Sequence, residues 1–570
     1  MTNASRKRAL SLKVLMVLGF LFFAMGLVLI ASSSTFAQEQ QKTQSSQVQS
    51  AQLSPLPDSP MEKAQKDGTA LPLSLKDLTK LALLNNLDIA ISDTNEELVN
   101  QRLNAAFGSY DPSLTASWTY SDQKSPNTNL TTASATTYNQ QMMHGWNSQF
   151  QQSLRATGGT FSARVTGGRS ANNQIFSIFS PQYNAGMNFS YTQPLLQNRK
   201  IDQNRMNIKL INLDIKTNDS TFRQQVNEII ASVQSQYWNL VSAKENYQIA
   251  RESVNLARLT LQNNRKKVEI GTLAAIDVTS AESQLASSEV QLIQAEENIN
   301  SLENAVRNLI SKDRDAEIWS KVIVPTDSPE FKERQIDLNL AIDTALKNRP
   351  ELEQQDIKLM QSDLNLELYQ NSKKWKLDAV GSFGSSGVAG PQNTKDGKPT
   401  TPEDLVGGAF TAYKLLFTGG FINWSVGVNV TIPVRTRSLD AQIAQNRITK
   451  QQSLMQRKKQ EQAILVEVRN AVQSLETKKK AVEQAKVATR YAKEQLEGEQ
   501  KRFEAGLSNT FLVLDAQNKL SSAQYQQIQS LINYKQAVIT ADKAMYTLLE
   551  SSDFEVAKET GNSTNVPDFK

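Results

Sequence analysis

Four short segments of the chain alternate between apolar and small polar residues, the period of two that is typical of β-strands. They cover residues 113–120, 187–192, 377–383 and 424–432, and the third has the weakest pattern. One face of each predicted strand is apolar or aromatic, and the other is mostly small and polar. Strands of a soluble β-sandwich and strands of a membrane barrel both show this alternation.

A further hairpin is predicted at residues 150–156 and 161–165, around Gly158 and Gly159. It either lengthens the main strands outside a membrane or adds strands to the sheet, and the pattern favours neither. Residues 384–420 are rich in Gly, Pro and charged residues, which predicts an extracellular loop.

Between the strands the hydrophobic period changes to that of long helices. The longest pattern runs from Gln203 to Ile270 and would span roughly 100 Å at 1.5 Å per residue. Beyond a glycine turn, apolar and small residues recur at heptad spacing, which predicts a coiled-coil seam with close helix approach. The seam residues are Leu285, Ser288, Leu292, Ala295, Ile299, Leu302, Val306 and Leu309, and later Leu520, Ala523, Tyr534, Ala537, Ala541 and Ala544.

The chain carries this arrangement twice. Residues 75–89 match residues 338–352 at an offset of 263, and residues 268–281 match residues 503–516 at an offset of 235. Ser74 and Asp337 precede the two first helices as predicted N-caps. Each repeat therefore reads helix, strands, very long helix, glycine turn and return helix. We place repeat 1 at residues 71–312, a linker at 313–337 and repeat 2 at 338–550.

The two ends of the chain predict export and flexibility. Four basic residues precede an apolar run from Val14 to Ala31, and small residues follow up to Ala37, which indicates a signal peptide at residues 1–37. The run of 18 residues also suits a retained inner-membrane anchor. Residues 38–70 are rich in Gln and Ser and predict a flexible periplasmic leader, and residues 551–570 predict a polar, frayed tail.

Composition excludes several classes of function. Loss of the four basic residues of the predicted signal takes the formal net charge from +5 to +1, and no basic patch with interleaved aromatic residues indicates nucleic-acid binding. The chain has no cysteine and one histidine, His144, which we expect in a surface loop. This inventory predicts neither an enzyme nor a metal or cofactor site. The mean hydropathy of −0.45 suits long solvated helices.

The strands and helices together predict a membrane barrel. An exported chain that places short alternating strands between very long polar helices has only lipid in which to bury the apolar faces. Open sheet edges are not viable in a bilayer, so the strands have to close into a barrel. Two strands per repeat give four per chain, too few to close, which predicts that several copies share one barrel. The alternative is a periplasmic coiled-coil scaffold held by an uncleaved N-terminal anchor.

From the duplication, the paired first helices, the Gln193–Leu195 and Ile432–Val434 segments and the paired glycine turns, the chain resembles the TolC-like outer-membrane efflux family between about residues 71 and 549. The resemblance implies an α+β membrane protein whose duplicated helix-strand repeats form a trimeric barrel of twelve strands, four from each copy. A long periplasmic coiled-coil barrel of helices continues it. The implied function is passive exit of cargo, with a periplasmic adaptor and an inner-membrane pump or ABC transporter as partners, in efflux or type I secretion.

The resemblance also implies functional positions at the two turns. Asp515 and Asp277 would lie at the periplasmic entrance, where the family places acidic rings, and Leu512 stands where a second acid is usual. Stabilisation of helix N-termini is the alternative role for the two aspartates. The exposed turns would dock the adaptor through Gly271, Thr272, Leu273, Gly506, Leu507 and Ser508. Both glycines also suit a left-handed helix cap, a role compatible with docking.

Overall fold

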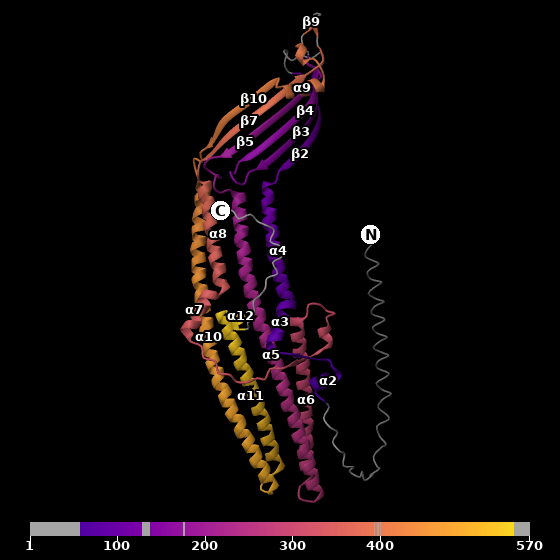
Figure 1. Ribbon diagram of the computed structural model, residues 1–570, viewed down its shortest axis with the longest axis vertical. Coiled ribbons are helices and arrows are strands. Elements are labelled where there is room, and N and C mark those ends of the chain that lie inside the picture. Colours follow the sequence, from indigo (N-terminus) through magenta and orange to yellow (C-terminus); the bar gives the residue numbers. More distant parts are fainter. Residues whose placement is uncertain are drawn as a thin grey trace, which may run out of the picture. The chain divides into compact units, whose positions relative to one another are not determined.

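The computed structural model describes residues 58–127, 137–174, 177–392, 394–395, 398–399 and 401–551. The predicted signal peptide, most of the leader and nearly all of the tail lie outside these residues. Within residues 58–551, one β-sheet stands at the end of a bundle of long helices (Figure 1). No helix among the described residues is long and apolar enough to cross a membrane.

The sheet has six antiparallel strands in the order β10-β7-β5-β4-β3-β2. Repeat 1 supplies four of them and repeat 2 supplies two. Their bounds are β2 Ser113–Pro126, β3 Tyr138–Ser153, β4 Thr160–Asn172, β5 Gln182–Pro194, β7 Lys376–Ala389 and β10 Phe421–Thr431. The additional hairpin therefore adds strands, and the expectation of four strands per copy is wrong.

The same hairpin differs from its predicted bounds. Its turn lies at Gly158, as predicted, but β3 begins at Tyr138 instead of residue 150. The first half of β3 is rich in Gln, Asn and Met, which hides the alternation in the sequence. His144 lies in this strand, with its ring centroid 4.6 Å from that of Tyr120, and not in a loop.

The predicted loop at residues 384–420 is also corrected. Strand β7 continues to Ala389, the short strands β8 (Thr394–Lys395) and β9 (Lys398–Pro399) follow, and α9 (Ala409–Thr418) packs against β5 and β7. Gly419 ends α9 in a left-handed conformation with φ of 72°. The glycines that suggest a loop are therefore partly strand residues and partly a helix cap.

The strand register keeps all apolar stripes on one face of the sheet. Directly opposed residues of antiparallel strands share a face, and a row of paired positions runs Trp118, Trp146, Gly167, Ala185 and Gly387. The opposite face is mostly small and polar, although Phe421 and Met143 lie on it. There the hydroxyl oxygens of Ser162 and Ser190 lie 2.7 Å apart, as do those of Ser382 and Ser425.

The two repeats supply eight main helices. In repeat 1 these are α3 (Leu75–Asn85), α4 (Leu87–Phe107), α5 (Gln203–Glu269) and α6 (Ala275–Ile310); in repeat 2 they are α7 (Leu338–Asn348), α8 (Pro350–Ser372), α10 (Arg437–Glu504) and α11 (Thr510–Met545). Short 3-10 helices occupy Gly108–Tyr110, Glu317–Ser320 and Glu403–Leu405, and α12 covers Leu548–Ser551. The predicted long helix is confirmed to within one residue.

The first helices of the repeats begin alike, as predicted. The Ser74 side chain accepts a hydrogen bond from the Asp77 amide at 3.2 Å, and Asp337 accepts one from the Leu340 amide at 2.9 Å. Each first helix then breaks at an extended residue, Asn86 or Arg349. Pro350 explains the second break, because the residue before a proline avoids the helical region.

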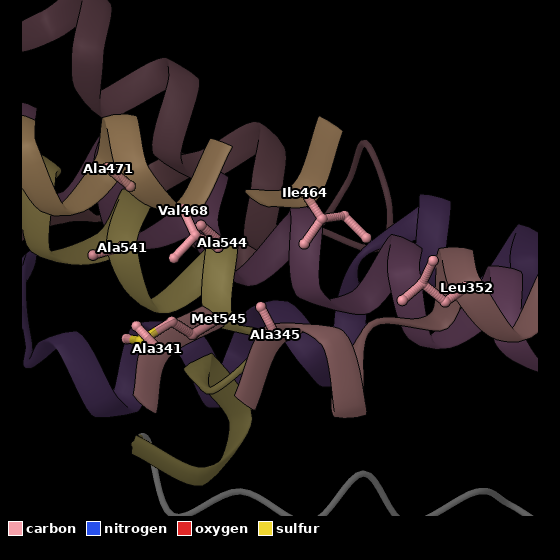
Figure 2. Close-up of a cluster of buried hydrophobic side chains, with 9 residues drawn as sticks. All are labelled: Ala341, Ala345, Leu352, Ile464, Val468, Ala471, Ala541, Ala544 and Met545. Atoms are coloured by element: carbon pink, nitrogen blue, oxygen red, sulfur yellow. The ribbon is translucent and has the colours of Figure 1, made fainter. Parts of the chain in front are cut away.

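Small residues bring the helices of repeat 2 together. Figure 2 shows a buried cluster in which α7, α10 and α11 meet around Ala345, Ala541 and Ala544, none more than 1% exposed. Alanine at these positions lets helix backbones approach closely. Of the predicted seam of α6, the heptad positions Leu285, Leu292, Ile299 and Val306 are buried, together with Ser288.

A strap around the helices begins before repeat 1 and includes the segment between the repeats. Helix α2 (Pro60–Asp67) lies within the predicted flexible leader. Strand β1 (Ala70–Leu73) begins at the last residue of that leader and pairs in parallel with β6 (Val322–Pro325). The last part of the leader is therefore ordered: Ser59 and Glu62 cap α2, and Arg251 of α5 donates to the Glu62 carboxylate at 2.8 Å. Tyr237 of α5 is fully buried beneath the strap and donates to Asp327 Oδ2 at 2.6 Å. Burial raises the pKa of this hydroxyl well above its usual range, so it remains a donor.

Candidate docking tips and channel wall

Both long helices reverse through the same turn. Gly271 and Gly506 adopt φ values of 76° and 72°, a left-handed conformation that other residues adopt poorly. The Thr272 amide donates to the Lys267 carbonyl at 2.9 Å, and the Leu507 amide donates to the Arg502 carbonyl at 2.8 Å. These are Schellman caps. No atom lies within 4 Å of a Cβ built on either glycine, so the backbone angle alone requires glycine here.

The two tips differ in their side-chain hydrogen bonds, but both expose apolar residues. At the first tip the Thr272 hydroxyl donates to the Lys267 carbonyl at 3.0 Å, and Leu273 is half-buried. At the second tip Leu507 and Phe511 are 76% and 73% exposed, and the Ser508 hydroxyl donates to the Glu499 carboxylate. Ile270 and Ile276 beside the first turn are likewise 73% and 69% exposed, so both tips present apolar side chains to solvent.

Polar contacts tie the tips together. The Lys267 ammonium lies 3.8 Å from the ring centroid of Phe503, a cation–π contact between the ends of α5 and α10. Asn264 is fully buried nearby and donates to the Asp277 carbonyl at 3.3 Å and to the Thr510 hydroxyl at 3.4 Å. The structure therefore brings the two glycine turns to the same end of the molecule.

The candidate entrance residues have distinct surroundings. Asp277 lies in the first turn of α6, where its negative charge interacts favourably with the positive end of the helix dipole. Asp515 lies beyond the first turn of α11, whose N-cap is Asn509 accepting from the Leu512 amide at 3.0 Å. The alternative role at a helix N-terminus therefore fits Asp277 and not Asp515. Leu512 is 43% exposed.

Asp515 has a partner that the sequence analysis missed. Lys519 Nζ lies 2.7 Å from Asp515 Oδ2, one helical turn further along α11. An acid followed by a lysine four residues later on a helix is the signal that could have found this pair. Among the described residues, no group of three or more His, Asp or Glu side chains could hold a metal ion.

The sheet forms a wall with two open edges. All 14 residues of β2 and all 11 residues of β10 are exposed, and neither strand has a second neighbour among the described residues. Apolar side chains on this wall face solvent in the single copy, with Trp118 70%, Trp424 73% and Val426 80% exposed. An apolar face and unpaired edges on one sheet are features that membrane barrels bury.

Comparison with solved structures shows the same fold in outer-membrane channels. The Campylobacter jejuni CmeC outer membrane channel is 17% identical, with a TM-score of 0.58 over 85% of this chain and 87% of that chain. The Vibrio cholerae outer membrane protein VceC is 14% identical, with a TM-score of 0.57 over 83% and 95%. The Neisseria gonorrhoeae MtrE outer membrane channel, in its open state, is 17% identical, with a TM-score of 0.54 over 83% and 88%.

A sequence search among curated proteins gave no match. A family model described as outer membrane efflux protein, however, matches residues 159–312 and 341–548. The two matched ranges fall in the two repeats and together exceed half of the chain. The first begins at the β3–β4 turn, so β2 and β3 precede the matched region. The chain therefore belongs to the outer membrane efflux protein family.

Proposed function

We propose that the chain is the outer-membrane exit duct of a tripartite efflux or type I secretion system, conducting cargo passively from its inner-membrane pump to the exterior. The observation that carries this function is the two-faced sheet joined directly to the long helices. Its apolar face suits lipid and its polar face suits a water-filled lumen. The helices then form the periplasmic part of the duct.

Three copies would close the barrel edge to edge. Strand β10 of one copy pairs with β2 of the next, so three six-stranded sheets give eighteen strands. Barrels of 16–18 strands leave an aqueous channel. The contact is heterologous, since two different edges meet, and a rotation that closes makes a ring.

Apolar stripes on the helices beside those edges support this assembly. Helix α4 leads towards β2 and exposes Leu87, Ile91 and Leu98 at spacings of four and seven. Helix α10 follows β10 and exposes apolar side chains at helical spacing opposite its packed face. They are Ile448, Met455, Val466, Val487 and Tyr491, each at least 39% exposed. Contact between the stripes of adjacent copies would remove both from water.

A cysteine pair tests this contact in a chain that has no cysteine of its own. Leu98 lies roughly 14 Å of helix from the end of α4, and Ile448 roughly 16 Å from the start of α10, at 1.5 Å per residue. A chain carrying both Leu98→Cys and Ile448→Cys should cross-link through a bifunctional maleimide into dimers and closed trimers. Each single variant should remain uncross-linked, because the edges differ. Cross-linking of a single variant would indicate like-to-like contacts and contradict the ring.

The glycine tips are proposed to dock the periplasmic adaptor. The backbone around Gly271, Thr272 and Leu273 and around Gly506, Leu507 and Ser508 is exposed or half-buried at the end of the bundle. Leu507 and Phe511 add apolar area to the second tip. An incoming helical hairpin of an adaptor could cover this area.

Gly506→Trp tests docking. A side chain at a left-handed position costs about 1–2 kcal/mol locally, and the bulk would obstruct the adaptor, while the sheet is roughly 100 Å of helix away. We expect export to fail with trimer and barrel intact. Gly506→Ala is the matched control, because it carries the same left-handed backbone strain at φ of 72° without the bulk. Normal adaptor cross-linking and export by Gly506→Trp would leave the tip as a structural cap only.

Asp515 is proposed to line the entrance as a single acidic ring of three carboxylates, with Leu512 in place of a second acid and Asp277 close by. Three carboxylates around a narrow entrance attract cations. The ion pair with Lys519 offsets part of each charge. Residues at this entrance would set ion preference without selecting a cargo.

A further inference from the structure

Helix α9 lies on the apolar face of the sheet, although it connects two strands at the end away from the long helices (Figure 1). Ala412 and Leu416 of the helix are buried against Ala185 and Ala389 of the sheet. Tyr413 accepts a hydrogen bond from Trp146 Nε1 at 2.8 Å. All three sheet residues belong to the apolar face, so α9 covers the outside of the proposed barrel and not its lumen.

The sheet is shaped to seat this helix. Gly167, Ala185 and Gly387 are paired in register across three strands and form a row of small residues on the apolar face. A Cβ on Gly387 would lie 1.9 Å from the Ala412 carbonyl oxygen, and one on Gly167 would lie 2.0 Å from the Tyr413 hydroxyl. The Ser385 hydroxyl donates to the Leu416 carbonyl at 2.8 Å. The position of α9 is therefore specified by residues of the sheet.

The opposite side of α9 presents apolar side chains outwards. Phe410 and Phe417 are 83% and 75% exposed, and Lys414 is exposed between them. Positions separated by four and three residues lie on one side of a helix. A Phe–Lys–Phe stripe suits a membrane interface, where the rings enter the acyl region and the ammonium extends to lipid phosphates.

We propose that α9 is an interfacial anchor that binds lipid of the outer leaflet and fixes the depth of the barrel. Lipid is the occupant because the stripe is continuous with the lipid face of the neighbouring strand: Phe417 is followed by Ile422 and Trp424 of β10, 58% and 73% exposed. Lys414 supplies the charge that an anionic headgroup binds. This inference rests on the proposed function, since it requires the apolar face of the sheet to lie in lipid.

Spin labels on single cysteines test the proposal in the full-length chain, reconstituted in vesicles of phosphatidylethanolamine and phosphatidylglycerol. Labels at Phe410→Cys and Phe417→Cys should collide more often with oxygen than with a water-soluble nickel complex, as lipid-exposed positions do. A label at Val426→Cys on β10 should lie deeper, and one at Asn188→Cys on the polar face should collide mainly with nickel. The depth of the Phe417→Cys label, measured by the same collisions, should be greater in these vesicles than in phosphatidylcholine vesicles. Adding Lys414→Gln should abolish this difference in depth.

The outcomes separate two failures. If Val426 is in lipid while residues 410 and 417 collide mainly with nickel, the anchor is wrong and the barrel stands. If residues 410 and 417 are shielded from both reagents, a protein segment covers α9 and the lipid anchor is again wrong. If Val426 itself lies in water, the proposed barrel fails and the anchor fails with it. Unchanged trimer content of each labelled variant on gels shows that the label has not unfolded the chain.

Discussion

Helices α5 and α10 occupy equivalent places in the two repeats and have nearly the same length, 67 and 68 residues, yet they differ in burial. Helix α5 has 25 buried residues and packs against α4, α6, α8 and α11. Helix α10 has nine and packs against α7, α8 and α11. In a single copy, α5 is therefore enclosed by other helices, whereas α10 lies at an edge with much of its surface exposed.

The exposed side of α10 carries more than the usual scatter of surface apolar residues. Ile464, Val468 and Leu475 pack inwards, while Met455 and Val466 lie on the opposite side, 60% and 54% exposed. An apolar stripe opposite a packed face is what a helix between two partners shows. The difference between α5 and α10 thus indicates where another copy belongs.

The largest predicted effect comes from placing a charge on each helix. Val233→Asp on α5 would bury an unpaired carboxylate at a position 0% exposed, at a cost of at least ~3 kcal/mol. Val466→Asp on α10 would cost the single copy less than about 0.5 kcal/mol but would place three charges in the proposed contact. We expect loss of helical circular dichroism for Val233→Asp, and normal dichroism without a trimer band for Val466→Asp.

Val466→Thr is the matched control for the edge variant, because it keeps the shape and adds no charge. Trimers of Val466→Asp as heat-stable as those of the control would mean that α10 faces water in the assembly. The exposed apolar side of α10 would then not be a contact between copies.

An intermediate effect is predicted for a latch that repeat 1 has and repeat 2 lacks. The buried Glu303 carboxylate accepts from the Ile323 amide and from Arg307, both at 2.6 Å, and so holds β6 on α6. The equivalent position of α11, at the offset of 235, is Val538. Glu303→Ala should lower the free energy of unfolding by about 1–3 kcal/mol, since it leaves a buried amide unpaired. Glu297→Ala, on the exposed side of the same helix, should have little effect.

The same latch predicts a pH dependence. Burial raises the pKa of the Glu303 carboxyl above its ordinary 4.5, against the opposing effects of the Ile323 amide and Arg307. Its contribution to stability is therefore fully present below pH 4.5 and is lost as pH rises through the raised pKa. Glu303→Gln should match the native chain in acid and become the more stable of the two towards neutral pH. If urea titrations gave the native chain and Glu303→Gln equal free energies of unfolding at pH 7 as well as at pH 4, the raised pKa would be contradicted.

The smallest effect is predicted at the tips, where the two return helices differ in charge pairing. Asp515→Asn should reduce cation selectivity in planar bilayers by less than about fivefold, because an exposed ion pair is worth under ~1 kcal/mol. Lys519→Gln should shift the reversal potential in the opposite direction by freeing the carboxylate. Unchanged reversal potentials and unchanged block by multivalent cations in both variants would remove Asp515 from the pore.

Much of this architecture could be predicted from the sequence because each part has a strong local period. The duplication, the 67-residue helix and the two glycine turns follow from heptads, caps and left-handed glycines. The prediction failed where the local signal is weak. The first half of strand β3 is rich in Gln, Asn and Met and shows no clear alternation, so the sequence predicts only a shorter hairpin in place of β3 and β4.

Long-range partners explain the other differences. Strand β1 is ordered by β6, some 250 residues away along the chain, and α9 is seated by Gly167 and Gly387 of distant strands. Neither contact leaves a periodic trace in the sequence. Lys519 could have been found, since its spacing from Asp515 is local.

The central claim is that each copy is one third of a ring, with β10 and α10 at one edge and β2 and α4 at the other. Native mass spectrometry of the protein extracted from outer membranes in mild detergent tests it most directly. We expect a complex of three copies, which Val466→Asp reduces to single copies while Val466→Thr does not. A native chain that occurs only as single copies under these conditions would contradict the account.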